Sequence, residues 1–328
     1  MTRDLPTPGA GAIDTHAHVY PAEYLDRLEA MGVDPETTRI ARDIDADITE
    51  DDLRERLEWM DRAGVAAQVL SVVPQSPAGT DPEASLRAAQ WINDCYAGLV
   101  TAHPGRFLAY GALPLPHIDQ SLAELERVLT LPGMVGIALP AVLAGGVTLD
   151  DPRLDPVWQA LDAAATVVYV QATGGGLQSP LLSDHGHTWV NGAPVEDATA
   201  VLHLLRADVP ARFPAIRFHV AHLGGDLPFL ARRLEDNYED WGSFAQSPLE
   251  ALTRMWLDAA NFHEPSLRLA VETFGRGRVM AGSDMPYFRR EKYVRAHENV
   301  RTSSLEAAEI EDILAGTARR LYGLPPVD

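Results

Sequence analysis

Short apolar runs alternate with longer amphipathic stretches along almost the whole chain. Eight runs are rich in β-branched residues and have the length of strands, and they lie at 11–19, 66–74, 106–114, 134–140, 165–173, 216–225, 255–261 and 278–286. Between them, apolar residues recur at helical spacing, as Leu53, Leu57 and Met60 do. Because strands that alternate with helices build a parallel sheet, this pattern predicts an α/β fold, a closed (β/α)8 TIM barrel. The alternative is an open doubly wound sheet, although no Gly-x-Gly-x-x-Gly follows any run to support a dinucleotide site.

Start signals precede several of the predicted helices. Thr49 and Asp52 resemble a capping box, in which the hydroxyl of the first residue accepts a backbone N–H of the first turn. Asp81 and Asp155 are each followed by proline, a pattern typical of an N-cap and the first helical position.

Two connections are longer than simple turns, residues 20–50 after the first run and residues 174–197 after the fifth. Both leave the carboxyl end of a predicted strand, where barrel enzymes have their active sites. We therefore expect one domain over residues 1–328, in which these two insertions form a lid or a pocket wall.

Composition and charge narrow the class of protein. The chain has 46% hydrophobic residues, enough for a sizeable core, and a formal net charge of −20, which argues against nucleic acid and anionic membrane surfaces as partners. Its one cysteine, Cys95, excludes an internal disulfide and a thiolate zinc cluster, and fits a cytoplasmic location. We expect neither a secretory signal nor a membrane-spanning segment. Lys292 is the only lysine, so a Walker-type phosphate loop is excluded.

Candidate chemistry begins on the first predicted strand. Asp14, His16 and His18 are two residues apart, so strand alternation predicts that all three share one face. If that face is the inside of the barrel, the two imidazoles form half of a site for a divalent metal.

Polar residues also follow other strands at the same end of the predicted barrel. Gln171 ends the fifth run, His222 the sixth and Asp284 the eighth, and we expect them to meet the histidine pair at the barrel mouth. A carboxylate at an apolar strand end needs a partner, which a metal would supply to Asp284. His219 has the opposite strand parity to His222, so we expect its ring to face the surrounding helices.

Several segments resemble one known family from residue 12 to residue 324. They are "IDTHAHVYP", "RLEWMDRAGVAAQVLSVVP", "AHPGRFLAYGALPL", "VAHLGGDLPFL", "LDAANFHEPSLRLAVETFG", "RVMAGSDMPY" and "LAGTARRLYGL". In this order they are similar to the aminocarboxymuconate-semialdehyde decarboxylase branch of the amidohydrolase superfamily. The resemblance implies a (β/α)8 metal enzyme that decarboxylates, hydrates or hydrolyses small aromatic or ring-cleavage acids.

The resemblance also implies roles for individual residues. His16 and His18 match the first-strand metal ligands, and Asp284 matches the eighth-strand ligand that also touches the metal-bound water. His222 matches the histidine that serves as an acid and base. Arg56 aligns roughly with a family arginine and is a candidate for binding a substrate carboxylate.

Strand five departs from the family pattern, because Gln171 stands where the family usually has a histidine ligand. Three interpretations stay open. Gln171 coordinates the metal through its amide oxygen, or His185 or His187 of the following insertion swings in, or the metal is weakly held or absent. Among further candidates, Trp189 shapes a wall against an aromatic substrate, and Asn261 lines the pocket.

We therefore expect a cytoplasmic, metal-dependent non-oxidative decarboxylase (a lyase) that acts on a small carboxylated aromatic or ring-cleavage compound. The metal is expected to be zinc, with manganese or magnesium as alternatives, and no organic cofactor is expected. One alternative is a hydrolase or hydratase acting on a lactone, amide or C–C bond, with or without a metal; another is a degenerate barrel that only binds ligand. The resemblance further implies a homodimer.

Overall fold

A computed structural model describes residues 5–325; residues 1–4, at the start of the segment in which we expect no signal, and residues 326–328 lie outside the described residues. Eight parallel strands form one sheet, in the order β1 (Ala12–His18), β2 (Val65–Ser71), β3 (Phe107–Ala112), β4 (Met134–Pro140), β7 (Val167–Gln171), β8 (Arg217–Val220), β9 (Trp256–Asp258) and β10 (Val279–Met280). Each predicted run overlaps one of these strands.

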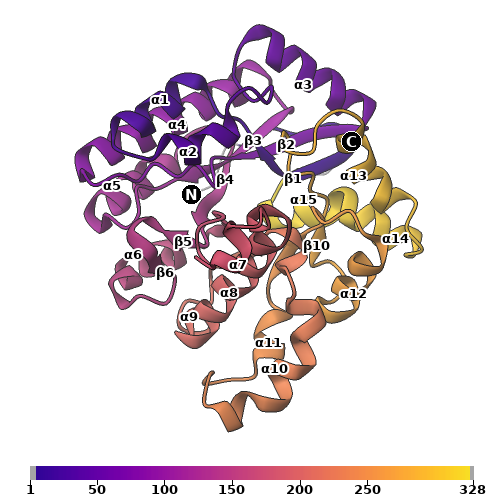
Figure 1. The fold of residues 1–328 in the computed structure, drawn as a ribbon. Helices are drawn as coiled ribbons and strands as arrows, with labels where there is room; N and C mark the ends of the chain where they lie inside the picture. Colours follow the sequence, from indigo (N-terminus) through magenta and orange to yellow (C-terminus); the bar gives the residue numbers. More distant parts are fainter. Residues whose placement is uncertain (1–4, 326–328) are drawn as a thin grey trace.

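The sheet curls round until its last strand meets its first (Figure 1). The backbone N–H of Thr15 donates to the carbonyl of Ala281, and that of His18 donates to the carbonyl of Met285. The TIM barrel is therefore confirmed, and the alternative of an open doubly wound sheet is wrong.

Helices surround the barrel on its outside. They are α1 (Ala22–Ala30), α2 (Pro35–Thr38), α3 (Glu50–Arg62), α4 (Pro82–Ala102), α5 (Ile118–Val128), α6 (Asp155–Ala163), α7 (Pro180–Ser183), α8 (Ala193–Arg206), α9 (Val209–Arg212), α10 (Leu227–Trp241), α11 (Pro248–Leu252), α12 (Glu264–Phe274), α13 (Glu291–Arg301), α14 (Ala307–Glu311) and α15 (Thr317–Tyr322). A large apolar cluster joins these helices to the outer faces of the strands. A second cluster fills the barrel with side chains such as Val69, Leu108 and Tyr169. Among the described helices, none is long and apolar enough to cross a membrane.

The predicted helix starts are mostly confirmed. The hydroxyl of Thr49 accepts the N–H of Asp52 at the start of α3, and Asp81 caps α4. The expectation for Asp155 is wrong, because it lies inside α6. A 3-10 turn, capped by Asp151, precedes this helix and moves the N-cap position to Leu154.

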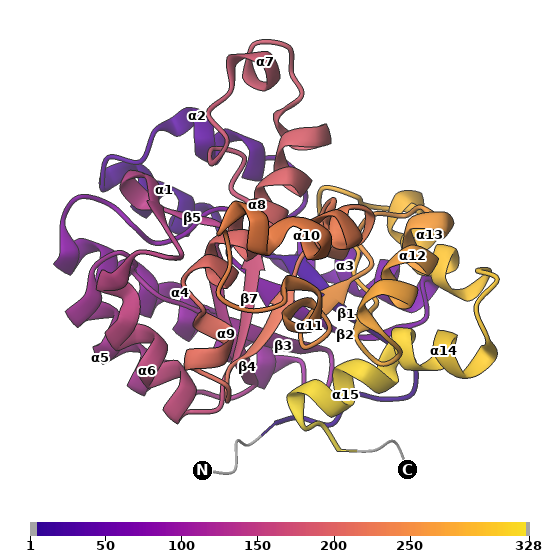
Figure 2. The same cartoon turned by 90° about the horizontal axis from the view of Figure 1, so that it is seen from below.

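The two insertions lie together at one end of the barrel. Residues 20–50 hold α1 and α2, and residues 174–197 hold α7, a π-helical turn at Thr188–Gly192 and the first turn of α8. Figure 2 shows α2 and α7 at the end of the barrel opposite α15. Both insertions, together with the hairpin of β5 (Val142–Leu143) and β6 (Val147–Thr148), line one pocket of about 560 Å³.

Candidate active site

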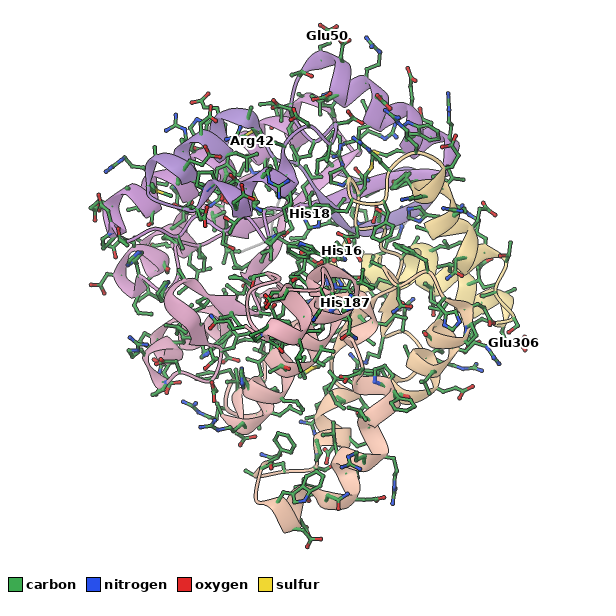
Figure 3. The ribbon with its side chains drawn as sticks, viewed as in Figure 1. His16, His18, Arg42, Glu50, His187 and Glu306 are labelled. Atoms are coloured by element: carbon green, nitrogen blue, oxygen red, sulfur yellow. The ribbon has the colours of Figure 1, made fainter. Side chains whose placement is uncertain are left out.

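His16 and His18 lie at the carboxyl end of β1, near the centre of the molecule, and both side chains are fully buried (Figure 3). The Nδ1–H of His18 donates to the carbonyl oxygen of Ser71 over 3.1 Å, since a carbonyl can only accept. The Nδ1 of His16 lies 3.0 Å from the Oδ2 of Asp258 and donates in the same way. In its neutral form each ring therefore carries its proton on Nδ1 and has its lone pair on Nε2.

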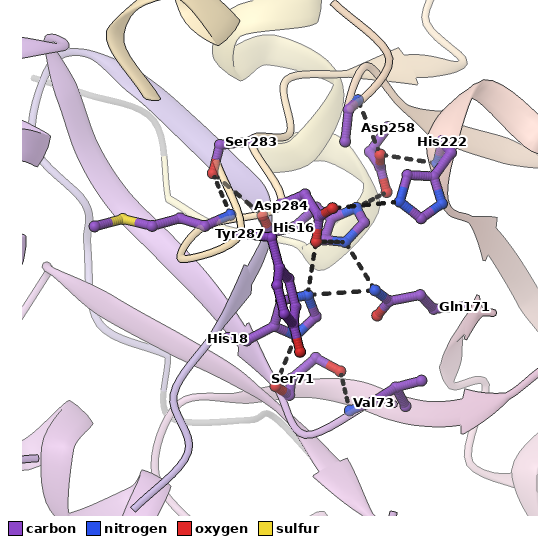
Figure 4. Close-up of polar contacts among 12 residues, drawn as sticks. His16, His18, Ser71, Val73, Gln171, His222, Asp258, Ser283, Asp284 and Tyr287 are labelled. Atoms are coloured by element: carbon purple, nitrogen blue, oxygen red, sulfur yellow. Dashed lines mark hydrogen bonds and ion pairs between the residues drawn. The ribbon is translucent and has the colours of Figure 1, made fainter. Parts of the chain in front are cut away.

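Asp284 directs an oxygen at both of these lone pairs. Its Oδ1 lies 3.2 Å from the Nε2 of His16 and 3.2 Å from the Nε2 of His18 (Figure 4). The backbone reaches this position through Gly282, where a Cβ would come within 3.0 Å of the Cβ of His16. Three electron-pair donors so close together repel one another unless a cation lies among them.

The pKa shifts of the cluster also indicate that it favours a positive charge among these side chains. Burial disfavours the charged form of His16, but the carboxylates of Asp258 and Asp284 outweigh it and raise the pKa of His16 to about 9. Burial opposes ionisation of Asp284 as well, yet the neighbouring histidines hold the pKa of Asp284 well below its usual range. Either a proton or a metal ion can compensate the negative charge of these carboxylates.

Gln171 closes the cluster from the end of β7. Its Nε2 lies 3.0 Å from the Nε2 of His16 and 3.3 Å from the Nε2 of His18. Its Oε1 is buried and has no hydrogen-bond partner among the described residues.

His222 faces the cluster from the other side. It follows β8 in the 3-10 turn η5 (His222–Gly224), and its Nε2 lies 3.7 Å from the Oδ2 of Asp284. Its Nδ1 lies 2.7 Å from the Oδ2 of Asp197, which projects from α8. Burial lowers the pKa of His222, but Asp197 more than offsets this, so the pKa of His222 lies well above its ordinary value. The ring is therefore an imidazolium whose Nε2–H faces the centre of the site.

A close approach of two backbones fixes the pair of His222 and Asp197. Gly225 has a φ of 64°, and a Cβ at this position would overlap the carbonyl oxygen of Pro194 in the first turn of α8. Only glycine lets the turn after β8 pack this closely against α8.

The atoms at this end of the barrel are close enough together for a divalent metal. One nitrogen or oxygen atom from each of His16, His222 and Asp284 lies within 4.8 Å of the other two, although the protonated ring of His222 has no lone pair to offer. His18 adds a further imidazole lone pair next to Asp284. Imidazole nitrogen and carboxylate oxygen together suit zinc and manganese.

Two orientation predictions are wrong. Asp14 does not share the inner face of His16, because the pairing of β1 with β2 shifts in register after it. Its carboxylate instead accepts the Nε2–H of Gln68 and the hydroxyl of Ser283. His219 does not face the helices. The strand β8 ends at Val220 and the turn η5 begins at His222, so the alternation of faces along a strand does not extend from His219 to His222.

His219 lies inside the barrel, where its ring contacts the rings of Tyr110 and Tyr169. Its Nε2 lies 3.2 Å from the Oδ2 of Asp258, and its Nδ1 lies 2.8 Å from the hydroxyl of Tyr110. Asp258 thus connects the metal-site histidine His16 to the core of the barrel.

The remaining predicted site residues lie outside the cluster. Arg56 is fully buried behind β1, where its guanidinium donates to the side chain of Gln68 and the carbonyl of His18, so it supports the strand and does not face the mouth. His187 and Asn261 are exposed. Trp189 is 45% exposed and lines the pocket between the insertions.

The sequence reasoning missed two carboxylates. Asp258 lies inside the apolar run at 255–261, as Asp284 lies inside the run at 278–286, and it could have been found in the same way. Asp197 lies within a helix, and no periodic pattern distinguishes it from a surface residue.

The pocket between the insertions lies at the same end of the barrel and is mainly apolar, and none of the cluster residues is part of its lining. Trp189 and Leu28 contribute from the two insertions, and Pro74 and Pro140 follow β2 and β4. Its lining includes the carboxylate of Glu36 but no lysine, arginine or histidine. A flat, uncharged ring fits such a lining better than a second anionic group does.

Comparison with known proteins agrees with the fold and with the family resemblance. The chain is similar to 2-amino-3-carboxymuconate-6-semialdehyde decarboxylase of Dictyostelium discoideum, at 26% identity over 96% of this chain and 92% of the relative. It is also similar to gamma-resorcylate decarboxylase of Rhizobium sp. (strain MTP-10005), at 26% identity over 82% of this chain and 86% of that protein. Among solved structures, dihydroxybenzoic acid decarboxylase from Polaromonas sp. JS666, with bound manganese and the inhibitor 2-nitroresorcinol, has the same fold, with a TM-score of 0.82 and 22% identity over 95% of this chain and 97% of that chain.

The family resemblance inferred from the motifs is therefore confirmed, and the curated relatives described above are carboxy-lyases. The family model described as amidohydrolase matches residues 13–324, which is almost the whole chain. The chain belongs to the amidohydrolase family.

Proposed function

We propose that this protein is a metal-dependent, non-oxidative decarboxylase that acts on a small carboxylated aromatic compound. The observation that carries the proposal is the convergence of His16, His18 and Asp284 opposite the protonated ring of His222. The decarboxylase relatives support the reaction class.

The metal site in this proposal consists of His16, His18 and Asp284. A divalent cation bound by these three residues would supply positive charge beside the substrate's oxygen atoms and would stabilise negative charge that develops on the substrate. The manganese in the structure of the dihydroxybenzoic acid decarboxylase supports manganese as the ion, and imidazole and carboxylate donors also suit zinc.

His222 has the role of the proton donor. As the bond between the ring carbon and the carboxylate breaks, its electron pair stays on the ring and carbon dioxide departs. The Nε2–H of His222 then gives its proton to that carbon, and Asp197 stabilises the imidazolium until the transfer. Asp258 and Ser71 keep the rings of His16 and His18 in the tautomer that the site requires.

The pocket supports the choice of an aromatic substrate whose negative charge lies at one end of the molecule. In this proposal the apolar lining receives the ring, and the carboxylate points toward the histidine cluster past Thr173, a lining residue two positions after Gln171.

Release of carbon dioxide from a panel of hydroxybenzoates and muconate-type acids tests the proposal. We expect about one zinc or manganese per chain, turnover of at least one panel acid, loss of turnover with a chelator and recovery with added metal. A metal-free protein whose activity survives the chelator would overturn it. Product formation without carbon dioxide would indicate the hydrolase or hydratase alternative.

The homodimer and the cytoplasmic location stay predictions. Light scattering of the purified protein measures the first, and fractionation of cells that express it measures the second.

A further inference from the structure

The side-chain amide of Gln171 is in an unusual environment. One of its two polar atoms faces the lone pairs of His16 and His18, and the other is buried without a partner. A buried carbonyl oxygen without a hydrogen bond costs about 1–3 kcal/mol. The structure therefore holds Gln171 in an arrangement that leaves it only half satisfied.

The two ends of the amide are exchanged by half a turn about its last carbon–carbon bond. The structure has the N–H end facing inward, which suits a cluster with neither a metal nor an added proton, because an oxygen there would add a fourth electron-pair donor to three. With a cation in the cluster the preference reverses, since the oxygen becomes a ligand and the N–H would be repelled.

The other candidates for the missing ligand are badly placed. His185 and His187 lie in the insertion after β7, and both are exposed. Neither can reach the cluster without displacing Gln171, which is only 3% exposed and already touches both metal-site rings.

Resting on the proposed function, we propose that Gln171 is itself a metal ligand and binds through Oε1. The site then has two imidazole nitrogens and two oxygens, one from Asp284 and one from Gln171. An amide oxygen is a harder donor than the imidazole it replaces, so this set favours manganese relative to zinc more than a three-histidine site does.

Calorimetric titration of chelator-stripped protein with manganese and with zinc tests this assignment. We expect Gln171→Ala to weaken the binding of both metals roughly tenfold or more, as loss of a ligand should. We expect Gln171→His to strengthen zinc more than manganese, so that the zinc-to-manganese affinity ratio rises roughly tenfold. Gln171→Glu retains an oxygen and should still bind metal.

Gln246→Ala provides the matched control, because this glutamine is exposed and binds Asp208 far from the site in sequence. Wild-type affinity in Gln171→Ala, an unchanged ratio in Gln171→His, or metal loss in Gln171→Glu as severe as in Gln171→Ala would each overturn the assignment. Melting temperatures without metal show whether each variant folds. Failure of the wild-type protein to bind either metal would instead count against the metal-dependent decarboxylase as a whole.

Discussion

At the scale of single residues, each histidine of the site is fixed by the partner of its other nitrogen. Asp258 holds His16, a backbone carbonyl holds His18, and Asp197 holds His222. Burial lowers the pKa of His18, so its Nε2 keeps a lone pair, whereas the nearby carboxylates raise the pKa of His16 and of His222 and favour a proton or a cation at Nε2. Three rings of the same chemical type therefore have two different roles because of their surroundings.

Removing the proton donor and removing its partner should have different effects. His222→Gln should lower kcat about 10²–10⁴-fold, because no group then gives a proton to the carbon. Asp197→Asn should lower kcat by a smaller factor and change its pH dependence. The donor must be protonated, so activity falls as the pH rises through the pKa of His222; without Asp197 that pKa is lower, and the fall begins at lower pH.

Profiles of kcat against pH for both variants and the wild-type protein measure this difference. An Asp197→Asn profile that coincides with the wild-type profile would show that Asp197 does not act through His222.

Asp284→Asn tests the carboxylate between the two first-strand histidines. The amide keeps the shape of the side chain but removes the charge that faces His16 and His18. We expect turnover to be abolished and metal content to fall, while the circular dichroism spectrum stays that of the wild-type protein. Unchanged activity would remove Asp284 from the mechanism.

At the scale of elements, the first turns of α8 connect the insertion to the catalytic histidine. Asp197 binds His222, and the adjacent Glu196 accepts the N–H groups of Thr173 and Gly176 in the loop after β7. Glu196 is 2% exposed, so its carboxylate is a buried anchor. Neighbouring helix residues point in different directions, which lets one helix position two parts of the site.

Glu196→Gln should loosen the insertion without disturbing the barrel. One of the backbone N–H groups loses its acceptor, because the amide has only one oxygen where the carboxylate has two. We expect faster proteolysis within residues 174–192 and a higher KM, with kcat changed less than KM. Glu250→Gln on the exposed helix α11 is the control, and a proteolysis rate equal to wild type would contradict the anchoring role.

At the scale of the whole molecule, a buried histidine makes stability depend on pH. His297 on α13 packs edge-on against Tyr293, and both of its ring nitrogens are buried without a hydrogen-bond partner among the described residues. Burial, reinforced by the charge of Arg301, lowers the pKa of His297 to about 3. The folded protein therefore resists a protonation that the unfolded chain accepts below its ordinary pKa of 6.5.

The free energy of unfolding should consequently fall as the pH drops from about 6.5 toward 3, by at most about 1.4 kcal/mol per pH unit from this one group. Above pH 6.5 His297 makes no pH-dependent contribution. Urea unfolding at several pH values should show a flatter slope for His297→Leu than for the wild-type protein. His263→Leu, at an exposed position, is the matched control, and equal slopes for His297→Leu and wild type would contradict the prediction.

The sequence by itself determined the barrel, its eight strands and five of the polar residues that meet at its mouth. It could do so because apolar periodicity records which faces are buried, and because parallel strands bring their carboxyl ends to one side. The tertiary structure alone decided which way each side chain points. A register shift in β1 turned Asp14 outward. The turn η5 after β8 made the strand alternation from which we predicted the direction of His219 inapplicable. The tertiary structure also brought Asp197 of α8 to His222. The sequence could not predict this contact, because contacts between segments far apart in the chain produce no periodic pattern.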